Sequence, residues 1–192
     1  MSFSLPIETD RLTLRRYVES DYDDLLKLQS SEEVTRFLLY DVRTPEQVRD
    51  ETLPKRLADI PAMNAHGQSF TLAVILRETG QHVGEVTLFG DNVEQRTGEI
   101  GYVFHPEFAG CGYASEASVE LLRLGFEKLG MHRIIARLDA RNTGSVKLLN
   151  RLGLRQEAHF VKNEFLKGEW TDELVFAMLA EEWDSGRNSL TA

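Results

Sequence analysis

Hydrophobic positions alternate with polar ones in four parts of the chain. One run covers residues 10–16, and three more cover residues 69–76, 82–89 and 98–104. A two-residue period is typical of strands with one buried face. Because the connections between the last three runs leave little room for helices, we predict an antiparallel meander there.

After Pro106 the period of the hydrophobic residues becomes helical. Apolar residues recur at three- and four-residue steps over residues 114–129, and Gly130 follows as a helix-ending residue. The order of strand and helix is then repeated, with a strand-like run at residues 132–138 and an amphipathic stretch at 142–152. This half of the chain therefore predicts strands linked by helices.

The two remaining regions complete a mixed α/β order. Helices that contain Pro45 and Pro54 are expected before the meander, and two final strand-like runs flank the polar residues 163–170. We predict one α/β domain over residues 1–183, with a mixed, mostly antiparallel central sheet of about seven strands flanked by helices. The polar tail, residues 184–192, is expected to be frayed.

The composition indicates a chain with an excess of negative charge. The 192 residues include 22 Lys and Arg against 31 Asp and Glu, which gives a formal net charge of −9. This charge repels nucleic acid and anionic membranes, and no stretch of about 18 apolar residues predicts a membrane span. Cys111 has no partner for an internal disulfide, and the N-terminus lacks a signal-peptide pattern. We therefore expect a cytoplasmic protein without direct nucleic-acid or membrane partners.

Residues 99–117 lead from a strand through Pro106 into a glycine-containing loop and directly into a helix. The first N–H groups of a helix have no partner inside it, and the helix dipole adds positive potential, so such a junction binds anions. Gly110 and Gly112 allow unusual backbone angles, and the small Ala114 leaves room for a ligand. We predict a phosphate-binding loop, against the alternative that the glycines only shape a turn.

The same loop nearly matches the dinucleotide-binding pattern G-x-G-x-x-G, with Asp139 downstream as a ribose ligand. However, Ser115 stands at the third glycine, and Asp139 lies later than the usual spacing of ~20 residues. The chain also has no G-x-x-x-x-G-K-S/T motif. A Rossmann-like nucleotide binder therefore stays only as an alternative.

Together these motifs resemble the GCN5-related N-acetyltransferases, and within them the ribosomal-protein N-terminal acetyltransferases, along nearly the whole chain. The family's pyrophosphate motif, Q/R-x-x-G-x-G/A, falls on residues 109–114, and the following Ser-Glu-Ala is similar to the subgroup's Thr-Glu-Ala. Ala109 replaces the usual Gln or Arg, so cofactor holding would depend more on backbone amides. The resemblance implies acetyl-CoA as cosubstrate and these pyrophosphate ligands: Ala109, Gly110, Cys111, Gly112, Tyr113 and Ala114.

A second resemblance to the family lies at Asn142 and Ser145, which form its N-x-x-S segment before a helix that ends at Gly153. It implies that Asn142 contacts the pantetheine arm. Asn142 could also cap the helix, because capping uses only its side-chain oxygen. Many relatives have a thiol-protonating Tyr four residues before the glycine, where this chain has Leu149. Ser145 is then the proton donor implied by the resemblance, with water as the rival.

The resemblance also implies that the strand with Tyr102, Val103 and Phe104 splays from its neighbour. Its backbone would then pair with the pantetheine like an added strand. An amide near Phe104 would stabilise the oxyanion of the transition state. Tyr102 and Phe104 would equally suit the core face of a sheet that binds no ligand.

Glu85 and Glu99, on adjacent strand-like runs, are the candidates for a general base that acts directly or through water. Either residue could instead be an outward-facing or structural carboxylate. Deprotonating a lysine amine at neutral pH costs roughly 4 kcal/mol, against about 1 kcal/mol for an α-amine. We expect acetyl transfer to a primary amine, and the subgroup resemblance implies a protein or peptide N-terminal α-amine.

The position of Cys111 near a helix N-terminus raises the alternative of a covalent acyl-enzyme. We expect direct attack instead, because the resemblance implies it and Cys111 occupies a variable position of the motif. The five histidines lack metal-ligand spacing, so no metal is predicted. The rival function is a non-catalytic CoA-sensing or protein-interaction module on the same fold, and a homodimer is compatible with the sequence.

Overall fold

One mixed sheet of eight strands runs through the part of the molecule that the computed structural model describes, residues 3–58, 60–92 and 94–184. The strands are β1 (Ile7–Glu8), β2 (Leu12–Arg15), β3 (Ser69–Leu76), β4 (His82–Asn92), β5 (Thr97–Phe104), β6 (Arg133–Asp139), β7 (Arg155–Leu166) and β8 (Glu169–Leu179), in the order β1-β2-β3-β4-β5-β6-β8-β7. Neighbouring strands are antiparallel except β5 and β6, which are parallel. The predicted α/β class is confirmed, and the short β1 accounts for eight strands rather than about seven.

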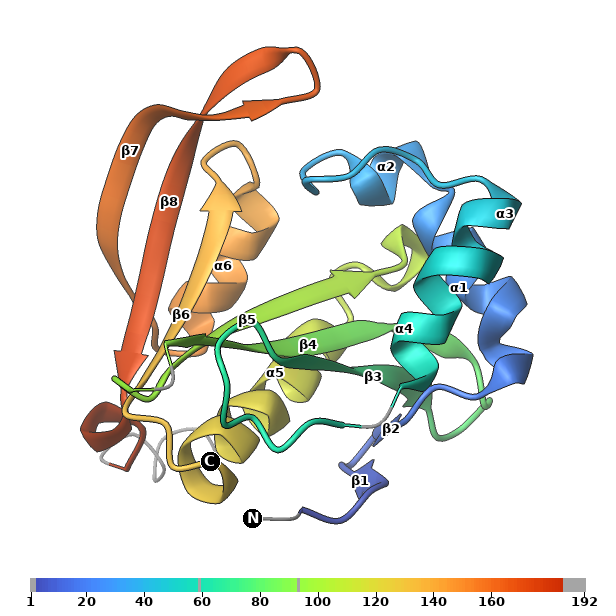
Figure 1. The fold of residues 1–192 in the computed structure, drawn as a ribbon, viewed down its shortest axis with the longest axis horizontal. Coiled ribbons are helices and arrows are strands. Elements are labelled where there is room, and N and C mark those ends of the chain that lie inside the picture. The colour runs from blue at the N-terminus through green and yellow to red at the C-terminus, as the bar shows by residue number, and fades with distance from the viewer. Residues whose placement is uncertain (1–2, 59, 93, 185–192) are drawn as a thin grey trace.

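Helical segments cover both faces of this sheet (Figure 1). They are a 3₁₀ turn (Glu19–Asp21), α1 (Tyr22–Gln29), α2 (Glu32–Thr35), α3 (Pro45–Gln47), a π turn (Val48–Thr52), α4 (Leu53–Leu57), a 3₁₀ turn (Pro106–Phe108), α5 (Tyr113–Arg123), a π turn (Leu124–Lys128) and α6 (Thr143–Arg151). Pro45 and Pro54 occupy the first turns of α3 and α4. Proline fits there because the first N–H groups of a helix have no internal partner.

The two faces of the sheet are buried by different helices. On one face, strand residues such as Leu88 and Ile134 pack with Leu121 of α5 and Leu149 of α6 in the main core. On the other face, Leu25, Val48 and Leu53 pack with Ala73 in a second cluster. Alternating residues of β3 contribute to both clusters, which explains why this strand is apolar on both sides.

The sheet divides into two halves between β5 and β6. These strands pair only over Thr97–Glu99 of β5 and Arg133–Ile135 of β6. Beyond that point β6, β8 and β7 turn away from β2 to β5, and Figure 1 shows the two halves diverging. The splayed strand implied by the family resemblance is therefore present, and it leaves the remainder of β5 unpaired on its β6 side.

At the C-terminal end the two final strands extend further than the sequence predicted. Both run into the polar residues 163–170, because β7 continues to Leu166 and β8 begins at Glu169. Polar residues occur in these strands because β7 is an edge strand with most of its side chains exposed. The expected frayed tail, residues 184–192, lies outside the described residues except for Asp184, which has helical conformation. Among the described helices, none has the length and apolar character needed to cross a membrane.

Candidate active site

The loop between β5 and α5 has the backbone conformation that the two glycines predicted. Gly110 and Gly112 have φ angles of +79° and +82°, a region that residues with a Cβ rarely adopt. Gly112 is the N-cap residue of α5. The chain therefore turns sharply enough to aim the first N–H groups of the helix into the space before it.

The N–H groups of this loop divide into engaged and available donors. The Ala109 N–H donates to the Pro106 carbonyl (2.9 Å). The Cys111 N–H donates to the Phe108 carbonyl (3.3 Å), so these two amides close turns of the loop. In the loop and the first turn of α5, five N–H groups have no hydrogen-bond acceptor among the described residues. They are those of Gly110, Gly112, Tyr113, Ala114 and Ser115. Among the predicted pyrophosphate ligands, residues 109–114, the amides of Ala109 and Cys111 are therefore not available. The amide of Ser115, which was not predicted, is available.

The turn between β1 and β2, distant in sequence, contacts the loop through Thr9 and Arg11. Glu116, in the first turn of α5, accepts hydrogen bonds from the Thr9 hydroxyl (2.5 Å), the Arg11 N–H (3.0 Å) and the Arg11 Nε (2.7 Å). The Arg11 Nη1 donates to the Cys111 carbonyl (2.8 Å), and its guanidinium lies 4.7 Å from the centre of the Tyr113 ring. Arg11 thus fixes the loop and adds positive charge beside the available amides. No local motif of the sequence indicated this role.

The backbone of β5 points a row of polar groups into the gap between the two half-sheets. The His105 N–H donates to the Val83 carbonyl of β4 (3.0 Å). Since successive residues of a strand point their N–H and C=O groups to opposite sides, those of Phe104 and Tyr102 point toward the open side. Val103, opposite Glu85 in the register, points its backbone groups at β4 instead. Of the three predicted strand residues, Tyr102 and Phe104 are therefore the ones able to pair with an extended ligand.

Asn142 and Ser145 lie at the start of α6, across this gap from β5. The Asn142 side-chain oxygen accepts a hydrogen bond from the Ser145 N–H (3.1 Å), so Asn142 is a helix N-cap whose amide NH₂ is left for another partner. Burial raises the pKa of the Tyr102 phenol to about 12, and the Ser145 side chain opposes this shift. The structure thus brings together the predicted residues Tyr102, Asn142 and Ser145.

Glu85 is buried in an ion pair with Arg56. The Arg56 Nη2 and Nε lie 2.7 and 2.9 Å from its two oxygens, and the Tyr17 hydroxyl donates a further hydrogen bond (2.9 Å). Burial opposes the charge of Glu85, but Arg56 and these hydrogen bonds outweigh burial, so the pKa of Glu85 is lowered. A carboxylate with both oxygens occupied and a lowered pKa is a poor proton acceptor. This geometry gives Glu85 a structural role.

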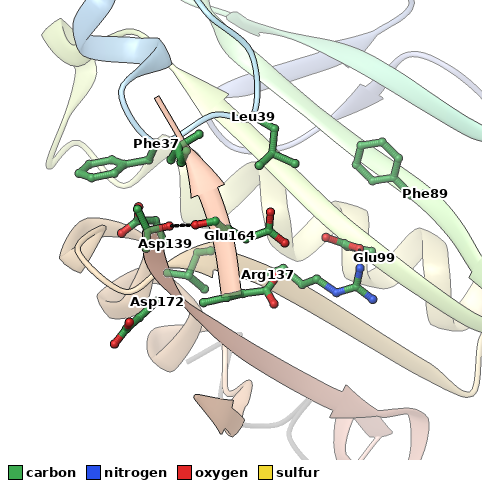
Figure 2. Close-up of a pocket in the computed structure, with 12 residues that line it drawn as sticks. Phe37, Leu39, Phe89, Glu99, Arg137, Asp139, Glu164 and Asp172 are labelled. Atoms are coloured by element: carbon green, nitrogen blue, oxygen red, sulfur yellow. Dashed lines mark hydrogen bonds and ion pairs between the residues drawn. The ribbon is translucent and has the colours of Figure 1, made fainter. Parts of the chain in front are cut away.

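Glu99 has the opposite environment, at the wall of a cavity of about 340 Å³. It lies at the last β5–β6 pair, where the sheet begins to split. Its carboxylate faces the Arg137 side chain across the cavity floor (Figure 2), at 3.6 Å from Nη1. Burial raises the pKa of Glu99, Arg137 lowers it, and Asp91 and Glu173 raise it, with a raised pKa as the result. Of the two predicted carboxylates, Glu99 is the one suited to accept a proton.

The cavity collects side chains from four separate parts of the chain and is strongly acidic. Its walls come from the segment after α2, from β4 and β5, from β6, and from the β7–β8 hairpin. The charged lining residues are Glu99, Arg137, Asp139, Glu164, Asp172 and Glu173, and Phe37, Leu39 and Phe89 form an apolar side (Figure 2). Sequence reasoning named Glu99 among these, and Asp139 only as a ribose ligand of the nucleotide-binding alternative, because strands far apart in sequence bring the lining residues together.

The five histidines and the acidic residues give no indication of a metal site. In residues 3–58, 60–92 and 94–184, no group of three or more His, Cys, Asp or Glu side chains is arranged to hold a metal ion. Cys111 is exposed, with its sulfur 4.0 Å from the Ala109 carbonyl.

The site combines a helix N-terminus with available amides, a split sheet beside it, and an acidic cavity beyond the split. This arrangement suits an extended anionic ligand next to a cationic one. The profile of the acetyltransferase (GNAT) domain matches residues 11–155 of the chain. The chain belongs to the GNAT family of N-acetyltransferases, and it is an acyltransferase acting on amino groups. Members of this family use acetyl-CoA.

Relatives in sequence and structure extend over nearly the whole chain. The uncharacterized N-acetyltransferase YnaD of Bacillus subtilis is 32% identical over 178 residues, which cover 93% of this chain and 99% of YnaD. The crystal structure of a GNAT-family acetyltransferase from Bacillus anthracis has a TM-score of 0.81 and 30% identity, and covers 93% of this chain and 100% of its own.

Two structures from Vibrio cholerae share the fold at lower identity. A spermidine N-acetyltransferase in complex with CoA and spermine has a TM-score of 0.77 and 22% identity, with 91% of this chain and 99% of that chain covered. A structure described as a ribosomal-protein-serine acetyltransferase has a TM-score of 0.73 and 22% identity, with 93% and 99% covered. The two names indicate different amine acceptors on one fold.

Proposed function

We propose that this chain transfers the acetyl group of acetyl-CoA to a primary amine by direct attack. The observation that carries the proposal is the order of the two binding elements. The available amides, those of Gly110 and of Gly112 to Ser115, follow directly after the open side of β5 at Phe104 and Tyr102. A diphosphate on the amides would therefore direct an attached chain along β5 toward Glu99.

In this proposal the residues around the gap orient the thioester. Backbone groups of Phe104 and Tyr102 pair with the pantetheine arm, and the free amide NH₂ of Asn142 donates to it from α6. A strand amide near Phe104 stabilises the oxyanion. These contacts restrict the thioester to the split of the sheet, which lies next to the acidic cavity.

The transfer step needs one proton acceptor and one proton donor. Glu99 takes a proton from the acceptor's ammonium, directly or through water, and the neutral nitrogen then attacks the thioester carbon. The C–N bond forms as the C–S bond breaks. The nitrogen then releases its second proton to water, and the leaving thiolate takes a proton from a donor that water reprotonates. Ser145, at the start of α6 across the gap from Tyr102, is the side chain we assign to this donation, with water as its rival.

The acidic cavity favours an acceptor with positive charge. Five of its six charged lining residues are carboxylates. The electrostatic attraction is therefore stronger for a cation than for a neutral amine. Two acceptors should be compared first. One is spermidine, which the name of one structural neighbour contains. The other is a protein or peptide N-terminal α-amine, which the resemblance to ribosomal-protein acetyltransferases implies. The reaction proposed here uses no metal and no nucleic acid.

An acetylation screen read by mass spectrometry tests the proposal. The wild type is incubated with acetyl-CoA and a panel of polyamines, peptides and small neutral amines, and both CoA release and product mass are measured. We expect a mass gain of one acetyl group on a cationic amine and no acetyl adduct on Cys111 of the enzyme. Tight acetyl-CoA binding in calorimetry with no product from any amine would favour the non-catalytic CoA-sensing module instead.

Substitution of Glu99 separates its role from that of the other cavity carboxylates. Loss of a general base lowers kcat by about 10² to 10⁴-fold, so we expect this effect in Glu99→Gln with acetyl-CoA affinity unchanged. Glu164→Gln removes a cavity charge of the same kind, and it should raise the acceptor KM with a smaller effect on kcat. Equal loss of kcat in both variants would contradict the assignment of the base.

A further inference from the structure

Arg137 is held in the cavity by charge alone. Its Nη1 lies 3.6 Å from a Glu99 oxygen and its Nη2 lies 3.7 Å from an Asp91 oxygen. Its guanidinium forms no hydrogen bond within the described residues. In contrast, Arg133 on the same strand and Arg141 just beyond it form bidentate hydrogen bonds to carboxylates. Its guanidinium can therefore move without breaking a hydrogen-bond network.

The charges that face Glu99 come from three neighbouring elements. Asp91, from the end of β4, and Glu173, from β8, both oppose the negative charge of Glu99. Arg137, from β6, is the cation among them, while Phe89 stands opposite Glu99 in the β4–β5 register and Leu39 covers the cavity from the segment after α2. Glu99 thus depends on Arg137 to stay charged in a partly buried, acidic place.

We propose that Arg137 is a positioning residue for the proposed reaction, one that keeps Glu99 ionised at the cavity wall and yields that contact to the acceptor's ammonium. This inference rests on the proposed function. Arginine suits the role because its guanidinium does not release a proton at physiological pH. Glu99 therefore receives no proton from Arg137. It takes one from the incoming ammonium, directly or through water, and the resulting neutral amine is the nucleophile.

Charge variants test this role with two readouts, one of which needs no substrate. The first is the titration of the Glu99 carboxyl carbon by NMR in ¹³C-labelled protein, assigned with Glu99→Gln. The second is the acid limb of the pH profile of kcat/KM. In Arg137→Gln we expect both midpoints to rise by about one pH unit, because the group that lowers the Glu99 pKa is gone.

Removing a negative charge near Glu99 should shift both midpoints in the other direction. Asp91→Asn should lower both midpoints, and the double variant with Arg137→Gln should return them toward the wild type. Arg137→Lys should largely restore the position of the acid limb, because it keeps a positive charge. Arg133→Gln is the matched control, since Arg133 lies on the same strand but pairs with Glu157, and it should leave both midpoints unchanged.

The outcomes for the inference and for the proposed function are distinct. If the wild type acetylates no amine in the screen, the proposed function fails, whatever the titrations show. If it is active but Arg137→Gln moves neither midpoint, or if Arg133→Gln moves them equally, the role of Arg137 is overturned while the acetyltransferase function stands.

Discussion

Gly112 is the single residue on which the proposed cofactor site depends most. Its φ of +82° turns the chain into α5, and a Cβ at this position would lie 3.4 Å from the Arg11 Nη2. A Gly112→Val variant should bind CoA at least about tenfold more weakly, a loss of about 1.4 kcal/mol. Its bulk obstructs the approach of a ligand to the backbone, and calorimetry with CoA measures the effect.

Gly80 provides the matched control for Gly112. It has a φ of +73° in the β3–β4 turn, and a Cβ added there would have no atom within 4 Å. Gly80→Val should lose about 1–2 kcal/mol of stability from the same backbone strain, with CoA affinity unchanged. Wild-type affinity in Gly112→Val, or an equal loss in Gly80→Val, would show that the loop is not the binding element.

Glu85 should matter for stability and for its dependence on pH. Glu85→Gln leaves Arg56 without its charged partner and should reduce the free energy of unfolding by about 3–5 kcal/mol at neutral pH. Because the folded-state pKa of Glu85 is lowered, its contribution is present above the unfolded pKa of about 4.3. It is lost as pH falls through the folded value.

Urea unfolding of wild type and Glu85→Gln across pH 3 to 7 checks this prediction. The two stabilities should differ most near neutral pH and converge as the solution becomes acidic. A difference that stays constant down to the lowest pH would mean that the ionised Glu85 is not the origin of the effect.

The roles of some of these residues can be predicted from the sequence, and those of others cannot. Gly110 and Gly112 can be read from the sequence because a local backbone requirement is written in consecutive residues. The role of Glu85 cannot, since its partners Arg56 and Tyr17 are 29 and 68 positions away. Glu85 and Glu99 look alike as strand carboxylates, and only their neighbours distinguish an ion-paired group from a cavity group.

At the scale of elements, the contact between the β1–β2 turn and α5 couples the N-terminal strands to the proposed cofactor loop. Glu116→Ala removes the acceptor of hydrogen bonds from Thr9 and Arg11, so Arg11 no longer supports the loop. We expect CoA to bind about tenfold more weakly, since a hydrogen bond to a charged group is worth about 1.5–3 kcal/mol.

Glu120→Ala is the control for this coupling. Glu120 lies one turn further along α5 and pairs with Arg123 within the same helix, so its loss should leave CoA affinity unchanged. Both variants should be compared by calorimetry at a temperature where each is folded. Equal CoA affinities in the two variants would mean that the contact of Glu116 with Thr9 and Arg11 does not support cofactor binding.

The elements themselves were predictable to the extent that their side chains have one buried face. The helix after Pro106 follows from a hydrophobic period of three to four residues, because it buries one stripe. In the meander, β3 and β4 are buried on both faces, so their apolar runs and the turns between them mark these strands. The ends of β7 and β8 next to their turn were not predicted, since an exposed edge strand has no buried stripe. The β5–β6 split came from family resemblance, as no local pattern encodes where two strands separate.

At the scale of the whole molecule, the acceptor cavity exists only because distant segments meet. The hairpin turn reaches the segment after α2, where the Lys167 Nζ lies 3.2 Å from the Tyr40 carbonyl and 3.5 Å from an Asp41 oxygen. Leu39 from that segment and Leu166 from the hairpin both line the cavity. The contact of Lys167 therefore joins the two sides of the acceptor site.

Lys167→Ala should loosen this side of the cavity and leave the cofactor site intact. We expect the acceptor KM to rise by up to about fivefold, since an exposed ion pair is worth at most about 1 kcal/mol, with CoA affinity unchanged. Lys162→Ala is the matched control, because Lys162 is on the same hairpin and shares the φ of 50°. Steady-state kinetics of both variants decide the point: an equal rise in KM would mean that loss of any hairpin lysine charge weakens acceptor binding. A rise only for Lys167→Ala would mean that the bridge to Tyr40 and Asp41 shapes the site.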